Sequence, residues 1–322
     1  MNKIYQSIHS YKFSGALLNL IQCYLYLLFT KNVAYFSLSI LGTLVFYYFS
    51  LVEKYVGVLQ VIISSSLALY SFYFFSKNSN NLYLSIFYFF MLVFFSKILT
   101  NKFVSQNAGP FFIILISSMA ATSKSGISFE SMHVMSIGIG MLFAIISSLI
   151  ITLYFNNTRN ELVKKCPNID FFQVGLYSFI LTIAFTVNLI YPLHHYNWLI
   201  VSCSAVMNGG DSILFKQRIQ NYSIGTIFGF LLSMFIIDFQ PDIKIVIIII
   251  SILYILISIF LKFRYSYMIT VCTILAIFLV YLSDKSLGLD LPLIRIQSIL
   301  SGLFIGTIGQ ILILKFKNND MY

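Results

Sequence analysis

Charged residues are scarce in this chain, and their scarcity excludes most classes of soluble protein. Only 9% of the 322 residues are Asp, Glu, Lys or Arg, whereas 59% are hydrophobic and the mean hydropathy is +0.90. A soluble domain is about one-quarter charged, so most of this chain cannot form a surface that faces water. The composition therefore predicts a polytopic membrane protein.

Proline, cysteine and clusters of reactive side chains are also sparse. The five Pro suit long helices, and the apolar runs are continuous rather than alternating, which argues against a membrane β-barrel. The four Cys show no metal-ligand spacing, and no catalytic triad or phosphate loop is present, so we expect no enzyme, no cofactor and no metal site. The net charge of +10 comes from single residues between apolar runs; we expect contacts with membrane lipids and none with nucleic acid.

Twelve apolar segments follow one another and predict an all-α bundle of about twelve transmembrane helices. They lie at roughly 14–29, 33–51, 56–75, 82–99, 110–122, 134–155, 172–191, 196–208, 222–238, 243–261, 265–282 and 293–314. Segments 110–122 and 196–208 are too short for a full span, so each is either extended by buried polar neighbours or re-entrant. No small-residue cleavage site follows the polar N-terminal residues, which predicts an uncleaved first span.

Lys and Arg are distributed unequally between the two sides that twelve crossings define. Fourteen fall on the side of the two termini and six on the opposite side. Because cytoplasmic loops carry the excess of positive charge, both termini are predicted to be cytoplasmic in a multi-pass protein of the plasma membrane.

The one hydrophilic interruption, at residues 156–170, divides the segments into two sets of six. This predicts a first membrane half at 1–155, a short cytoplasmic linker and a second membrane half at 171–322. An offset of 162 residues superposes the sixth segment on the twelfth, pairing Ser136, Gly140, Ala144 and Ser148 with Ser298, Gly302, Gly306 and Gln310. Since six is even, two such repeats would run parallel.

Small residues recur at four-residue steps in three of the segments. Positions four apart share one face of a helix, and Gly or Ser on that face lets another backbone approach closely. We predict helix packing, with pore lining as the alternative, at Gly140, Gly225, Gly229, Ser233, Gly302 and Gly306.

Arginines near the starts of later segments are candidates for binding an anion. Arg218 precedes Tyr222, Arg264 precedes Tyr267, and Arg295 opens the last segment. A guanidinium beside a Tyr hydroxyl can bind a carboxylate or phosphate through parallel hydrogen bonds. The alternatives are snorkelling to lipid phosphates and, for Arg295, an ion pair with Asp290.

The short segment 196–208 carries unusual polar residues for its length. Ser202 and Asn208 must face a partner helix or water, so they are candidates for lining a path, while Trp198 is predicted to sit at the outer interface. None of the ten acids lies in the middle of a segment. Asp211 and Glu53 are the nearest candidate proton carriers, although their basic neighbours make them poor ones.

The order of these residues resembles a known family. Tyr196-Asn197-Trp198, then Arg218 ahead of Gly225-Thr226 and Gly229, is similar to the signature of the fusaric acid resistance (FUSC) or aromatic acid exporter family. The stretch 263–267 and Arg295 ahead of Gly302 resemble its later landmarks. The resemblance covers roughly 172–314, and the first half only through the shared six-helix plan. Two features depart from it: the short linker, and Asn197 between Tyr196 and Trp198.

The resemblance implies two parallel six-helix halves, a dimer or similar assembly, and export of organic anions such as aromatic carboxylates. It extends to plant anion channels activated by aluminium and malate. We therefore expect an exporter of small organic anions. A passive anion channel and a non-transporting membrane partner of cell-envelope machinery are the alternatives.

Overall fold

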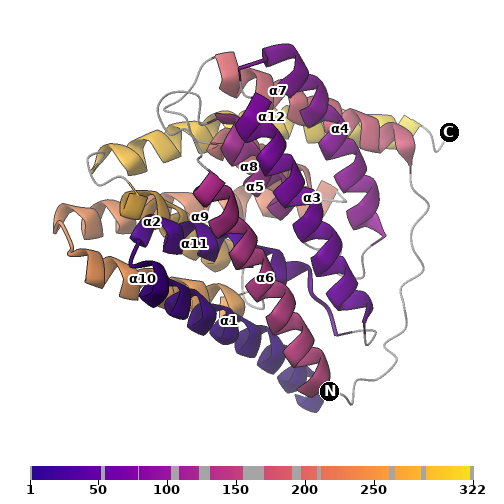
Figure 1. The fold of residues 1–322 in the computed structure, drawn as a ribbon. Helices are drawn as coiled ribbons and strands as arrows, with labels where there is room; N and C mark the ends of the chain where they lie inside the picture. Colours follow the sequence, from indigo (N-terminus) through magenta and orange to yellow (C-terminus); the bar gives the residue numbers. More distant parts are fainter. Residues whose placement is uncertain are drawn as a thin grey trace. The chain divides into compact units, whose positions relative to one another are not determined.

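The computed structural model is helical throughout the part of the chain that it describes. This part comprises residues 2–51, 55–78, 80–102, 109–122, 131–154, 170–190, 197–208, 212–260, 265–283 and 288–319, and it contains no strand. The helices (Figure 1) are α1 Asn2–Thr30, α2 Val33–Thr43, the 3-10 helix η1 Leu44–Tyr48, α3 Val56–Asn78, α4 Leu82–Asn101, α5 Phe111–Thr122, α6 Ser131–Tyr154, α7 Phe171–Ile190, α8 Trp198–Met207, α9 Ser212–Asp238, α10 Ile243–Phe260, α11 Tyr265–Ser283 and α12 Asp290–Asn319. The predicted all-α fold is confirmed.

Nine of the described helices are long and apolar enough to cross a membrane, and three are shorter. Two of the short ones, α5 and α8, correspond to the segments that the sequence marked as too short. The third is α2 with η1, where the sequence predicted one uninterrupted segment at 33–51. The α-helix ends there at Thr43 and tightens into a 3-10 turn, after which Phe49 is extended, with φ −65° and ψ 134°.

Polar residues begin several helices by accepting hydrogen bonds from the first free backbone amides. The Asn32 side chain accepts from the amides of Ala34 and Tyr35 at the start of α2, and Asn81 accepts from that of Leu84 at the start of α4. Asp170 accepts from the amide of Phe172 at the start of α7. Such caps satisfy donors that have no partner inside the helix.

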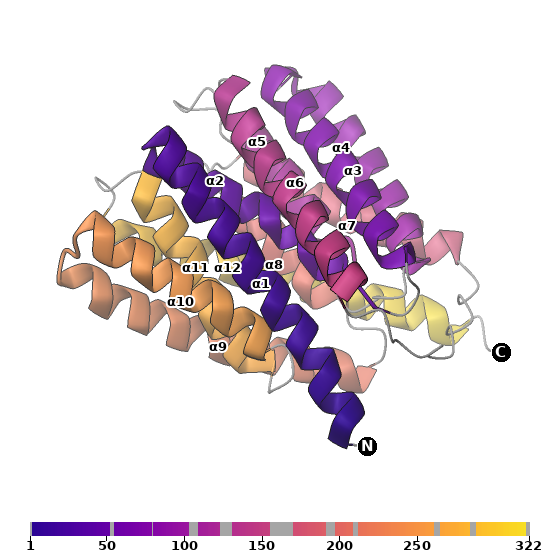
Figure 2. The same ribbon diagram turned by 60° about the horizontal axis from the view of Figure 1, so that its bottom comes forward.

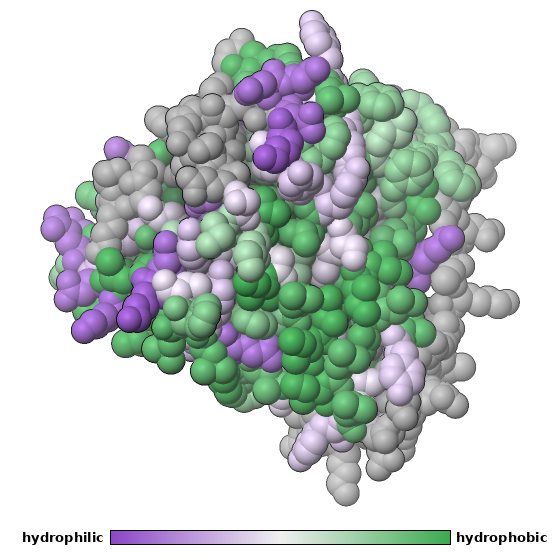
Figure 3. All heavy atoms as spheres, in the orientation of Figure 1, coloured by the Kyte–Doolittle hydropathy of each residue, from purple (hydrophilic) through white to green (hydrophobic). Residues whose placement is uncertain are grey.

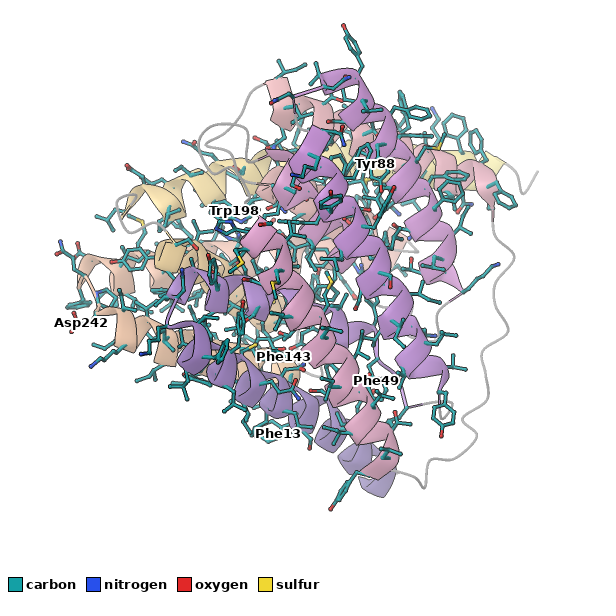
Figure 4. All side chains as sticks on the ribbon, viewed as in Figure 1. Phe13, Phe49, Tyr88, Phe143, Trp198 and Asp242 are labelled. Carbon is teal, nitrogen blue, oxygen red and sulfur yellow. The ribbon has the colours of Figure 1, made fainter. Side chains whose placement is uncertain are left out.

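Large apolar side chains are exposed along the helices, as expected for a surface in contact with lipid. On α1 the most exposed are Leu25, Leu28 and Phe29; Phe13, on the same helix, is labelled in Figure 4. Hydrophobic residues predominate over much of the face seen in Figure 3. A soluble protein would expose little contiguous apolar surface of this kind, so the chain is a multi-pass membrane protein.

The chain forms two compact units, and each unit draws on both predicted halves. Unit 1 comprises Met1–Val61, Met135–Thr158 and Gln220–Ile296; unit 2 comprises Ile62–Val134, Arg159–Ile219 and Gln297–Tyr322. Unit 1 therefore contains α1, α2, α10, α11 and most of α6 and α9, whereas unit 2 contains α4, α5, α7, α8 and most of α3 and α12.

Within unit 1, α10 packs between α11 and α1, and α2 contacts both α1 and α11; Figure 2 shows α1 and α10 running alongside one another. Hydroxyl groups join these helices. The Tyr24 hydroxyl lies 2.7 Å from the Ser251 hydroxyl, and the Tyr254 hydroxyl donates to Thr43 Oγ1 at 2.8 Å. Hydrogen bonds between neutral groups thus join the helices inside unit 1.

Within unit 2, α7 packs against α4 and α8, and α5 packs against α8. The two short helices therefore lie against each other, and all ten residues of α8 are buried. The amide nitrogen of Asn197, at the start of α8, donates to the carbonyl of Leu115 at 2.6 Å and to Ser118 Oγ at 2.9 Å on α5. A helix too short to span is tolerated here because protein surrounds its ends.

Candidate functional site

A lysine within a membrane-spanning helix is the centre of the candidate site. Lys97 lies one turn before the end of α4, and its Nζ donates a hydrogen bond to Asn208 Oδ1 at 3.2 Å. The same ammonium group lies 4.6 Å from the centre of the Tyr177 ring, a cation–π contact. Ionisable side chains inside spans are unfavourable and mark functional paths.

Residues from α7, from α8 and from the stretch before α5 hold this lysine in place. Tyr177, on α7, lies with its hydroxyl 3.1 Å from Ser204 Oγ on α8. Asn208 is the C-cap of α8. Gly109, just before α5, adopts φ +50°, and a Cβ atom there would lie 2.6 Å from Asn208 Oδ1. The close approach of Gly109 thus fixes the amide that accepts the hydrogen bond from Lys97.

A second cation approaches the same place from the first turns of α9. Arg218 interacts electrostatically with both Lys97 and Tyr177, and its side chain is partly buried. Lys97 and Arg218 carry like charges, so the arrangement favours an anion that interacts with both. We call Lys97, Tyr177, Asn208 and Arg218 the cationic cluster; all four belong to unit 2.

The structure divides the predicted path residues between the two units. Arg218, Asn208, Ser202 and Trp198 lie in unit 2. Ser202 donates to the carbonyl of Leu199 on its own helix at 3.0 Å and packs against Gly302. Trp198 is buried at the start of α8 and is labelled in Figure 4. Glu53, Asp211 and Arg264 lie outside the described residues.

The remaining predicted residues belong to unit 1, where Arg295 is only 7% exposed. Arg295 interacts electrostatically with Tyr222 and Cys272, and the pairing of Tyr222 with Arg218 stays a prediction. Tyr267 is half exposed, with its ring 5.9 Å from that of Phe260.

The small-residue steps lie where helices approach closely. A Cβ atom at Gly140 of α6 would overlap the carbonyl of Ser39 on α2, and one at Gly302 of α12 would overlap that of Leu199 on α8. Gly306 lies next to α8 as well, Gly225 and Gly229 of α9 meet α11, and Ser233 is fully buried.

Sequence reasoning missed Lys97 and Tyr177. Lys97 was counted only as a topology charge, although it falls inside the apolar segment 82–99, and this position was the signal that could have revealed it. Tyr177 is one of 22 Tyr, and nothing in the sequence distinguishes it from the others.

The described residues contain no group of three or more His, Cys, Asp or Glu that could hold a metal ion. The acids among them, Asp170, Asp238, Asp242 and Asp290, lie at helix ends or in turns; Asp242, in the turn before α10, is labelled in Figure 4. Within this part of the chain, the cationic cluster brings together two positive charges and hydrogen-bond donors, a combination that suits an anionic ligand.

Comparison with known proteins supports a family assignment for the later helices. No curated protein and no solved structure matches the chain. Residues 180–309 match the family model described as fusaric acid resistance protein-like. The match includes Asn208 and Arg218 of the cationic cluster, together with most of α7 and all of α8 to α11. The resemblance seen in the sequence is thereby confirmed over residues 180–309, which are similar to the fusaric acid resistance protein-like family.

Proposed function

We propose that this protein exports small organic anions, aromatic carboxylates among them, from the cytoplasm across the plasma membrane. The observation that carries the proposal is the cationic cluster, in which a lysine inside a span is held against a tyrosine ring and near an arginine. The family match supports membrane transport in general. A dimer, which the family resemblance implies, is part of the proposal.

The cluster combines the groups that a carboxylate needs. A carboxylate within about 4 Å of one such cation gains about 4 kcal/mol at an effective dielectric constant of about 20. The Arg218 guanidinium can bind two carboxylate oxygens in parallel, and the buried Tyr177 ring holds the Lys97 ammonium group in place. Lys97 and Arg218 would together bind the carboxylate.

The predicted topology places the cluster at the cytoplasmic side. Lys97 and Asn208 lie at the ends of α4 and α8, and Tyr177 and Arg218 lie near the starts of α7 and α9. With both termini in the cytoplasm, all four positions fall on the side from which cargo for export is loaded. The distribution of Lys and Arg along the chain supports this assignment of the cytoplasmic side.

A passive anion channel is the second candidate, and the position of the acids favours it. Within the described spans, the acids lie at helix ends, whereas proton-coupled carriers commonly use an intramembrane carboxylate or His. Planar-bilayer recordings separate the two. A channel gives currents whose reversal potential follows the anion gradient, while a carrier gives flux that depends on a proton gradient.

Efflux from proteoliposomes tests the proposed function. Vesicles that contain the purified full-length protein are loaded with radiolabelled benzoate, and the rate of loss is compared with that of empty liposomes. We expect Lys97→Gln and Arg218→Gln each to reduce efflux about tenfold or more, because each removes one charge from the site.

Lys216→Gln is the matched control, since Lys216 lies on the same turns of α9 and is exposed. It should leave efflux unchanged. Wild-type efflux no faster than that of empty liposomes would contradict anion export. Equal efflux by Lys97→Gln and wild type would show that the cationic cluster is not the binding site.

A further inference from the structure

Two contacts between α4 and α7 fix the register of these helices in unit 2. The rings of Phe89 and Phe185 stack with centroids 4.1 Å apart and planes 4° apart, and Lys97 lies over Tyr177. Eight residues forward on α4 correspond to eight residues back on α7, so the helices run antiparallel with constant register. At a rise of about 1.5 Å per residue, the two contacts lie about 12 Å apart along the seam.

The stacked pair is part of a layer of aromatic side chains next to the cationic cluster along α4 and α7. Phe75 of α3 completes it, with its ring 5.9 Å from that of Phe185 and 6.4 Å from that of Phe89. All three side chains are fully buried. Such a layer offers an anion no hydrogen-bond donor, so an anion that passed it would meet an unfavourable environment.

Asn188 lies on α7 just beyond this layer, on the side away from the cationic cluster. It follows Tyr177 by eleven residues, which is about three helical turns, so the two side chains share one face of α7. Asn188 is only 2% exposed. Its Nδ2 and Oδ1 atoms are both buried, and neither has a hydrogen-bond partner in the described part of the chain.

Two other buried amides have partners for their nitrogen atoms. The Asn197 amide nitrogen has two acceptors on α5, and that of Asn19 donates to the Tyr254 hydroxyl at 3.4 Å, although Asn19 Oδ1 has no partner in the described part of the chain. Leaving a buried polar group unsatisfied destabilises a protein by about 1–3 kcal/mol. Native proteins keep few such groups and tend to keep them at functional sites.

We propose that Asn188 is a second polar subsite for the transported anion, beyond the layer of Phe75, Phe89 and Phe185. Its amide nitrogen donates a hydrogen bond to a carboxylate oxygen that has passed the aromatic layer. Because the amide is neutral, it holds the anion more weakly than Lys97 and Arg218 do, which suits release on the far side. This inference rests on the proposed export function.

Asn188→Leu tests the subsite, because Leu has a similar size and lacks polar atoms. Purified protein is compared with wild type in three measurements: benzoate binding in detergent, benzoate efflux from proteoliposomes and the thermal midpoint of unfolding. We expect unchanged binding and efflux reduced about tenfold, since only passage beyond the layer is impaired. The thermal midpoint should be equal or higher, because an unsatisfied amide has been removed.

Two further variants keep the test decisive if Leu disturbs folding. Asn188→Thr retains a hydroxyl and should keep efflux within about threefold of wild type. Phe89→Ala opens the aromatic layer and should make efflux faster while the Asn188 subsite remains. Wild-type efflux by Asn188→Leu, or equal loss of efflux by the Thr and Leu variants at normal stability, would overturn the subsite alone. Absence of efflux from the wild-type protein would overturn the export function and the subsite together.

Discussion

Units 1 and 2 each contain three helices from the first predicted half and three from the second, and helices at corresponding positions of the two halves belong to different units. Unit 1 takes the first, second and sixth helices of the first predicted half and the third to fifth of the second half; unit 2 takes the complementary set. Each unit thus completes one six-helix plan with helices from both halves. This pattern supports the proposal of two parallel repeats and adds an exchange of helices between them.

One helix–helix contact is made in the same way within each unit. Gly140 of α6 meets the Ser39 carbonyl of α2 in unit 1, and Gly302 of α12 meets the Leu199 carbonyl of α8 in unit 2. Gly140 and Gly302 are related by the same 162-residue offset that the sequence revealed. Membrane helices associate through close backbone contacts at small residues, because lipid provides no hydrophobic driving force for their association.

The units differ where the cationic cluster lies. The offset that relates them replaces Lys97 and Tyr177 by Ile259 and Gly15. A Cβ atom at Gly15 would overlap the Phe46 ring, so this corner of unit 1 is filled by an aromatic side chain. The comparison indicates that one scaffold serves packing in unit 1 and, as we propose, anion binding in unit 2.

Substituting the two paired glycines is expected to have the largest effect. Gly140→Val and Gly302→Val each force a side chain into a backbone carbonyl, which cannot move aside as a flexible side chain can. We expect each to lower the free energy of unfolding by about 3 kcal/mol or more, measured as a fall in the thermal midpoint in detergent. Gly175→Val is the control, because nothing lies within 4 Å of its added Cβ. A large loss at only one of the two contacts would break the equivalence of the units.

Replacing Gly109 should separate strain from function. Gly109→Ala and Gly288→Ala both place a side chain at positive φ, +50° and +42°, which destabilises each by about 1–2 kcal/mol. Only Gly109 meets Asn208, whereas nothing lies within 4 Å of a Cβ at Gly288. We expect benzoate efflux to fall for Gly109→Ala alone; an equal fall for both would attribute it to strain.

The smallest effects should come from removing single hydroxyls. Tyr254→Phe in unit 1 loses hydrogen bonds to Asn19 and Thr43, whereas Tyr177→Phe in unit 2 loses one to Ser204 and keeps its ring against Lys97. At about 1 kcal/mol per hydrogen bond, chemical denaturation should show the larger loss for Tyr254→Phe. Efflux should persist in Tyr177→Phe, and its abolition would assign the hydroxyl a direct role.

The sequence predicted the fold better than the site, for a physical reason. Apolar length determines a span, so α5 and α8 could be recognised as too short from their residues alone. The positions of Arg218 and Asn208 in the cationic cluster followed from neighbouring polar patterns. Lys97 lies next to Tyr177, and Asn188 lies about three turns away, because of the register of α4 on α7. This register depends on packing between segments far apart in the chain.

The exchange of helices could not be predicted from hydropathy. The hydrophilic stretch 156–170 suggested two consecutive halves, and the small-residue steps indicated that they correspond. Neither pattern specifies which helix packs against which, because lipid-facing and protein-facing apolar residues are alike in composition.

The sharing of helices has a consequence for how the protein is made. Unit 1 requires chain as far as residue 296, and unit 2 requires the remainder of α12. During synthesis, the first six helices therefore enter the membrane before the later helices of either unit exist. Tyr24 of α1 and Lys97 of α4 must wait in lipid or in the insertion machinery until their partners Ser251 and Asn208 arrive. Assembly of both units is thus a late event in biosynthesis, completed nearly together when the last helix inserts.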